Sequence, residues 1–79
     1  MPTILRVEGF RFFFFSNEMQ EPPHIHVEKG DGYAKVWLVP LELSYSHGLT
    51  RAELRRMREI AEEHQATLLE RWNEYFANR

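Results

Sequence analysis

The residues on either side of the segment 30–32 alternate between apolar and polar, and this pattern limits the fold more than any other part of the chain. Successive side chains of a strand point to opposite faces of a sheet. The pattern therefore predicts strands over residues 24–29 and 33–39, joined by a tight turn. A two-residue turn gathers one wholly apolar face, made of Ile25, Val27, Ala34, Val36 and Leu38. The opposite face then carries His24, His26, Glu28, Tyr33, Lys35 and Trp37.

The register across this turn remains open at this point. Either Gly30-Asp31 or Asp31-Gly32 could be the two central residues, which places His26 opposite Lys35 or Trp37. A three-residue loop would shift the pairing by one residue and mix the two faces. The clean separation of apolar and polar side chains favours the two-residue turn.

A run of phenylalanines nearer the N-terminus predicts a strand that is covered on both faces. Residues 3–8 and 10–16 are expected to pair as strands around Glu8-Gly9, because glycine adopts the positive φ that a tight turn needs. In the second strand the aromatic side chains fall on both faces, which is typical of a central strand. A loop or a second copy of the chain is needed to cover the face that a helix leaves open.

The C-terminal third of the chain predicts one long helix, from Arg51 to about Ala77. Thr50 and Glu53 have the spacing of a capping box, with Thr50 as the N-cap. At 1.5 Å per residue the helix would be about 40 Å long, roughly twice the length of a typical strand. Either the helix breaks, or its last turns pack on something else, such as a partner chain. Those last turns carry Trp72, Tyr75 and Phe76.

Together these segments predict an α+β fold, a four-stranded antiparallel β-meander packed against one long C-terminal helix. The expected single domain, residues 1–79, has a β-rich part (1–40), a connector (41–49) and a helix (50–77). The helix should cover the apolar face with Leu54, Met57, Ala61 and Leu68. A chain of this size buries only about 60% of its unfolded surface, and it has no cysteine for disulfides. Aromatic packing, a histidine-bound metal or oligomerisation must therefore supply further stability.

Charge and hydropathy narrow the functional classes. The formal net charge of −2 argues against a general polyanion binder but leaves a local basic patch open. The N-terminus lacks the features of a signal peptide, and the apolar run Phe12–Phe15 is too short to span a membrane. We therefore expect a cytoplasmic protein that is not embedded in a membrane. The absence of cysteine excludes thiol catalysis.

The alternating histidines form the first candidate site. His24 and His26 share a strand face with Glu28 and Lys35, and these four residues are the candidate catalytic groups. Histidine titrates near neutral pH and suits acid–base chemistry.

The same two histidines, His24 and His26, could instead hold a divalent metal such as zinc. The further ligands would be Glu28 or one of the loop residues Glu18 and Glu21. The third interpretation is structural: two surface histidines hydrogen-bonded to Tyr33, to loop carbonyls or to water.

The second candidate site is basic. Arg51, Arg55 and Arg58 lie in the first turns of the expected helix, where they could bind a phosphate or an RNA backbone. The alternative is a solvated face balanced by the helix glutamates. Of the other histidines, His64 is interpreted as a residue at the edge of the core, and His47 in the connector could approach the face of His24 and His26.

Four motifs give the chain a family resemblance: Met1-Pro2-Thr3-Ile4, Gly9-Phe10-Arg11-Phe12-Phe13-Phe14, Glu21-Pro22-Pro23-His24-Ile25-His26-Val27 and Trp72-Asn73-Glu74-Tyr75-Phe76. With these motifs the whole chain resembles the bacterial and archaeal family called domain of unknown function 4160. The resemblance implies a small protein encoded beside a small partner, commonly of domain of unknown function 2442, in a toxin–antitoxin-like arrangement. It implies no settled activity, and His24 and His26 are the site candidates that match its motif.

Two functions follow as hypotheses. One is a protein-interaction component of a toxin–antitoxin-like operon. It would bind an operon-encoded partner or form a homo-oligomer, through the aromatic end of the helix or a sheet edge. The alternative is a small hydrolase, such as an RNA-cleaving toxin, that uses the His-x-His face with or without a metal.

Overall fold

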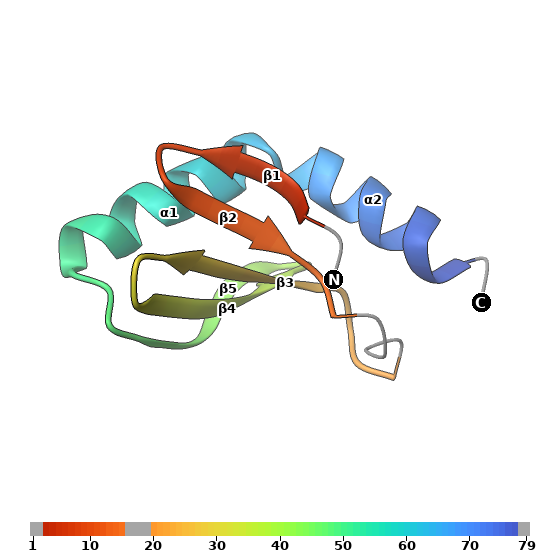
Figure 1. Ribbon diagram of the computed structural model, residues 1–79. Coiled ribbons are helices and arrows are strands. Elements are labelled where there is room, and N and C mark those ends of the chain that lie inside the picture. The colour runs from red at the N-terminus through yellow and green to blue at the C-terminus, as the bar shows by residue number, and fades with distance from the viewer. Residues whose placement is uncertain (1–2, 16–19, 78–79) are drawn as a thin grey trace.

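A computed structural model describes residues 3–15 and 20–77 of the 79-residue chain, with Ala77 described by its backbone alone. Five strands form one antiparallel sheet in chain order, followed by two helices (Figure 1). The strands are β1 (Thr3–Val7), β2 (Phe10–Phe13), β3 (His24–Lys29), β4 (Gly32–Leu38) and β5 (Leu41–His47). The helices are α1 (Arg51–Glu63) and α2 (Gln65–Ala77). The α+β class and the meander are confirmed, and the numbers of strands and helices differ from the prediction.

The β3–β4 hairpin has the predicted two-residue turn, with Gly30 and Asp31 at its centre. Lys29 pairs with Gly32, and His26 lies opposite Lys35. The apolar set predicted for one face is buried, with exposures between 0% and 4%. The positive φ of Gly30, 58°, fits the turn geometry that this register needs.

The connector predicted over residues 41–49 is wrong, because residues 41–47 form the fifth strand. Pro40 lies in the two-residue turn between β4 and β5, where its missing N–H costs no ladder hydrogen bond. The register of β5 shifts between two neighbouring pairs: Tyr45 lies opposite Lys35 and Leu43 opposite Val36. Ser44 is therefore an extra residue, a β-bulge. Leu43 lies on the helix side of the sheet and Tyr45 on the other side.

The single helix predicted over residues 50–77 is also wrong in detail, because it breaks at His64. A helix longer than the strands was expected either to break or to pack its last turns on something else, and it breaks. Thr50 caps α1 as predicted, with the reciprocal Thr50–Glu53 hydrogen bonds of a capping box, at 2.8 and 3.0 Å. Gln65 begins α2 and donates a 2.6 Å side-chain hydrogen bond to the Leu38 carbonyl at the end of β4. This bond fixes the junction of the helices to the sheet.

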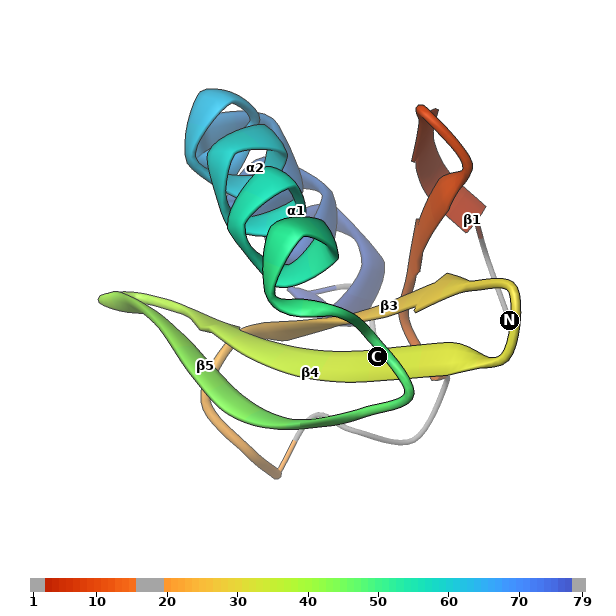
Figure 2. The same ribbon diagram turned by 90° about the vertical axis from the view of Figure 1, so that its left-hand side faces the viewer.

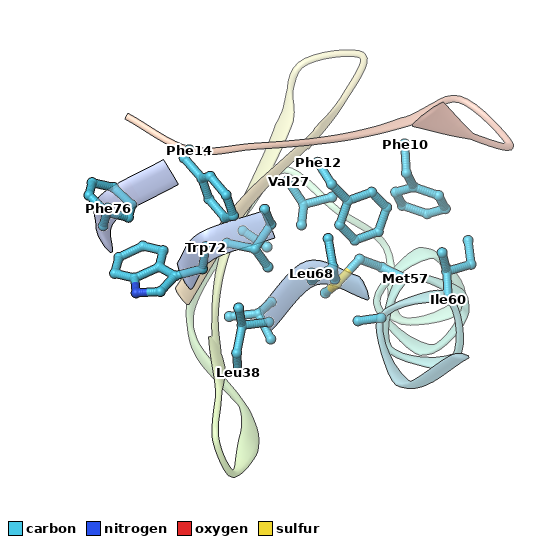
Figure 3. Close-up of a cluster of buried hydrophobic side chains, with 14 residues drawn as sticks. Phe10, Phe12, Phe14, Val27, Leu38, Met57, Ile60, Leu68, Trp72 and Phe76 are labelled. Atoms are coloured by element: carbon cyan, nitrogen blue, oxygen red, sulfur yellow. The ribbon is translucent and has the colours of Figure 1, made fainter. Parts of the chain in front are cut away.

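One apolar core joins the sheet to both helices (Figure 3). The predicted contact is confirmed: Met57, Ala61 and Leu68 are buried against the apolar face, and Leu54 packs at its edge. At one end of the core, the ring of Phe14 lies 5.3 Å from that of Trp72 and 6.1 Å from that of Phe76. The aromatic end of the helix therefore packs on a phenylalanine of its own chain.

The two faces of the sheet are covered by different parts of the chain (Figure 2). Both helices lie over one face, and the β1–β2 hairpin rises beside them. The segment 20–23, which leads into β3, runs beneath the other face. Its Pro23 carbonyl accepts a 3.0 Å hydrogen bond from the Leu38 amide. This hydrogen bond extends the β3–β4 ladder by one pair beyond His24 and Trp37. The cover expected over the second face of residues 10–16, a loop or a second copy of the chain, stays a prediction.

A bidentate ion pair joins the β1–β2 turn to α1. Arg56 donates hydrogen bonds of 2.8 and 2.5 Å to the two carboxylate oxygens of Glu8, and another of 3.0 Å to Glu59. The hydrogen bonds from Arg56 hold the pKa of Glu8 below its usual value; the charges of Arg56 and Lys29 add to this, and desolvation opposes it. Glu59, one of the helix glutamates, thus pairs with Arg56.

Replacing the buried Trp72 by alanine is expected to destabilise the protein by about 3–5 kcal/mol, the usual cost of removing a large core aromatic side chain. Urea unfolding followed by far-UV circular dichroism measures this cost. The control is Arg71→Ala, at the exposed neighbouring position, which should change the stability by less than about 0.5 kcal/mol. Equal stability of Trp72→Ala and the wild type would show that this end of the helix is not part of the core.

The Glu8–Arg56 pair predicts a pH dependence of stability. Because the folded-state pKa of Glu8 is lowered, its contribution is complete above the unfolded pKa of about 4.3 and is lost as the pH falls through the folded value. Glu8→Gln should therefore be slightly less stable than the wild type at pH 7 and equally stable at about pH 2. Thermal melts across this range test the effect, and a difference that grows on acidification would contradict the assignment.

Candidate functional site

The sheet register gathers the predicted catalytic residues on the face away from the helices. Residues that lie opposite each other in antiparallel strands share a face. One row across the sheet consists of Phe13, His26, Lys35 and Tyr45. The neighbouring row consists of Arg11, Glu28, Tyr33 and His47. We call this surface the polar face.

His24 is completely buried at the start of β3. Its ring centroid lies 5.4 Å from that of Trp37 on β4 and 5.0 Å from that of Trp72 on α2. Its Nδ1 lies 2.9 Å from the Pro22 carbonyl oxygen, and because that oxygen can only accept, Nδ1 carries the proton. The proline that leads into the strand thus orients the ring, and His24 helps to join β3 to α2.

His26 is also buried, with 4% of its surface exposed. Its ring stacks on Phe13 at 5.5 Å and lies 4.5 Å from the ring of Phe15. Its Nδ1 is 2.6 Å from the hydroxyl oxygen of Tyr33. The structural interpretation predicted hydrogen bonds from the two histidines to Tyr33 and to loop carbonyls. His26 is bonded to Tyr33, and His24 to the Pro22 carbonyl, as that interpretation predicted. The expectation that these histidines lie on the surface is wrong, because aromatic rings and the loop before β3 cover them.

The two charged residues of the predicted site are held in ion pairs. Glu28 accepts a 2.9 Å hydrogen bond from Arg11, and Lys35 donates one of 2.7 Å to Glu21. The Lys35 ammonium also lies 4.6 Å from the centroid of the Trp37 ring. Both pairs are partly exposed, and such pairs contribute about 0–1 kcal/mol, so a competing ligand could replace either partner.

The metal interpretation gains no further ligand from the described residues. Within residues 3–15 and 20–77, no three His, Asp or Glu side chains are grouped so that they could hold a metal ion. Of the proposed ligands, Glu28 and Glu21 pair with Arg11 and Lys35, and Glu18 lies outside the described residues. Metal binding at His24 and His26 stays a prediction.

A shallow depression of about 610 Å³ lies on the polar face, over β4 and β5. It is lined by Tyr33, Lys35, Ser44, Tyr45 and His47. The rings of Tyr33, Tyr45 and His47 lie 5.6–5.7 Å from one another. The prediction that His47 approaches the histidine face is thus borne out through Tyr33, which lies between His47 and His26.

Sequence reasoning missed Ser44 and Tyr45 as lining residues. The alternation of β5 would place Leu43 and Tyr45 on the same face, and only the bulge at Ser44 separates them. The apolar–polar alternation of residues 41–47 was the signal that could have revealed the strand.

The predicted basic site lies on the other side of the sheet. Arg51, Arg55 and Arg58 are exposed on α1, which packs against the apolar face. Arg55 and Arg58 line an apolar groove of about 200 Å³ between α1 and the β4–β5 part of the sheet. The two sets of predicted site residues therefore belong to different faces and do not form one site. His64 is half-buried at the junction of the helices, in keeping with its expected place at the edge of the core.

The chain is thus a small α+β protein whose polar face carries histidine and aromatic rings. A family model described as "Domain of unknown function (DUF4160)" matches residues 9–73. Because the match covers most of the 79 residues, the chain belongs to this family. No curated protein and no solved structure matches the chain. Neither helix, over its described length, is long and apolar enough to cross a membrane.

The hydrogen bond between His26 and Tyr33 predicts that the hydroxyl groups of Tyr33 and Tyr45 contribute differently to the stability of the protein. Tyr33→Phe should destabilise the protein by about 1–3 kcal/mol, because it removes the hydroxyl from the buried Nδ1 of His26. Tyr45→Phe removes the hydroxyl of a side chain that is half exposed, and should change the stability by less than about 0.5 kcal/mol. Urea unfolding of both variants measures the difference, and equal effects would argue against a buried His26–Tyr33 bond.

Proposed function

We propose that the protein is a protein-interaction component of a toxin–antitoxin-like operon and that it binds its partner through β5. One observation carries this proposal: β5 is the last strand of the sheet, seven residues long, with exposed Leu43 and Tyr45. An edge strand offers backbone N–H and C=O groups to an incoming strand. Exposed apolar side chains beside that edge supply area for a partner to bury.

The operon context rests on the family resemblance, and the choice of surface rests on packing. The aromatic end of the helix was the other surface considered for the partner. Trp72 and Phe76 are 5% and 8% exposed, and both lie against Phe14. Their burial in the chain's own core favours the sheet edge over the helix end as the binding surface.

Leu43→Arg is expected to abolish co-purification with the small protein encoded beside this gene, because it places a charge among the apolar side chains next to the edge. Leu43 is 40% exposed, so the variant should remain folded. The control is Thr3→Arg, an exposed position on β1 at the opposite edge of the sheet, which should leave binding intact. Isothermal titration calorimetry measures both. Equal binding by Leu43→Arg and the wild type would exclude the β5 edge.

A second candidate function is hydrolysis, such as RNA cleavage, on the polar face. The depression favours this candidate, because it brings Lys35 and His47 beside two tyrosines. Lysine offers a cation for a phosphate, histidine titrates near neutral pH, and exposed tyrosine rings can stack on bases. The buried His26 would then orient the Tyr33 hydroxyl and exchange a proton with it, without touching the substrate.

Growth on induced expression separates the two candidates. If the protein cleaves RNA, the wild type should arrest growth and Lys35→Ala/His47→Ala should not. These partly exposed positions are better targets than His24 and His26, whose replacement would disturb the core. Ser46→Ala, a neighbour of His47 on β5, serves as the control. Normal growth with all three proteins would count against the hydrolase.

A further inference from the structure

The groove between α1 and β5 has an apolar floor and opens beside the edge strand. Its volume is about 200 Å³. It is lined by Val36, Leu41, Glu42, Leu43, Leu54, Arg55, Met57 and Arg58. A cavity of about 150 Å³ lined by aliphatic side chains holds a benzene-sized group. The groove therefore has room for one aromatic or branched aliphatic side chain.

The residues that line the groove carry more positive than negative charge. Arg55 and Arg58 are exposed, and neither forms an ion pair with any residue that the structure describes. In contrast, Arg11, Lys35 and Arg56 are each paired with a glutamate. The lining contains one carboxylate, Glu42, for the two guanidinium groups. The local charge is thus opposite in sign to the net charge of −2 of the whole chain.

We propose that β5 and this groove bind an extended acidic segment of a partner protein. The segment adds a strand beside β5, places one bulky apolar side chain in the groove and directs carboxylates to Arg55 and Arg58. Residues two apart in a strand share a face and lie about 7 Å apart. The recognised pattern is therefore an apolar residue with acidic residues at alternate positions. Guanidinium groups bind carboxylates in bidentate geometry, which favours this partner chemistry.

Charge also decides between this partner and a second copy of the chain. Two copies paired through β5 would bring two sets of Arg55 and Arg58 to one interface. Each copy would supply the single groove carboxylate Glu42, so the interface would hold four arginines and two glutamates. Like charges placed together at an interface oppose association. An acidic segment removes this repulsion.

The inference rests on the proposed function and specifies the chemistry of its partner, and synthetic peptides test it. The probe is the blocked nonapeptide Glu-Thr-Glu-Thr-Phe-Thr-Glu-Thr-Glu, which places phenylalanine and all its glutamates on one face of a strand. Three matched peptides each change one feature of the probe. The first has lysine in place of every glutamate, and the second has alanine in place of phenylalanine. The third carries methyl groups on alternate backbone nitrogens, which removes the N–H groups that would bond to β5. Calorimetry measures binding to the full chain. We expect the acidic probe to bind and each matched peptide to bind about tenfold or more weakly.

Charge reversal on the protein completes the test. Arg55→Glu/Arg58→Glu should lose the acidic probe and gain the lysine peptide. The control is Arg6→Glu/Arg71→Glu, which makes the same charge change at exposed positions outside the groove, on β1 and α2. It should retain the preference of the wild type for the acidic probe. An equal loss in both double variants would show a general effect of net charge and overturn the inference.

The remaining outcomes separate the inference from the function on which it rests. Suppose that Leu43→Arg abolishes partner binding, but that the lysine peptide and the acidic probe bind the wild type with equal affinity, or that no peptide binds. The inferred acidic chemistry of the partner is then wrong, and the β5 interface stands. If Leu43→Arg has no effect on the partner and no peptide binds, both proposals fail. A dimer in analytical ultracentrifugation that Leu43→Arg dissociates would identify a second copy as the occupant and overturn the inference.

Discussion

The two-residue turn at Gly30 and Asp31 is the constraint on which the rest of the structure depends. It sets the register of β3 against β4, and with it the face to which every side chain of the hairpin points. A slip of β3 by one residue would turn His26 toward the helices and move Ile25 and Val27 out of the core. The core, the polar face and the loop that covers the histidines all follow from this register.

The sequence allowed prediction of those parts of the fold that local chemistry determines. The alternation around the turn predicted the faces of β3 and β4 and left two registers open, and Thr50 with Glu53 predicted the start of α1. The fifth strand was missed because Pro40 was taken as the end of the sheet, although residues 41–47 alternate between apolar and polar side chains. The bulge at Ser44, which places Leu43 and Tyr45 on opposite faces, leaves no mark on that alternation. The break at His64 depends on the length of the sheet below the helix, which no local pattern encodes.

The sequence predicted which candidate residues share one face of the sheet, but not which of them a ligand can reach. The alternation placed His24, His26, Glu28 and Lys35 on one face, as observed. Burial was not predictable, because the rings that cover the histidines come from distant parts of the chain: Phe13 and Phe15 lie before the loop, and Trp72 lies on α2. The side chains left open to ligands are instead those of β4 and β5.

The bulge at Ser44 gives the edge strand a double role. It turns Leu43 toward the groove on the helix side and Tyr45 toward the depression on the polar side. A segment bound along β5 would therefore lie beside walls of both concavities. Thermodynamic linkage then requires reciprocity: whatever a partner on the edge does to the affinity of the depression for a ligand, that ligand does equally to the affinity for the partner. A single inserted residue thus provides a route by which two opposite faces of a very small protein can be energetically coupled.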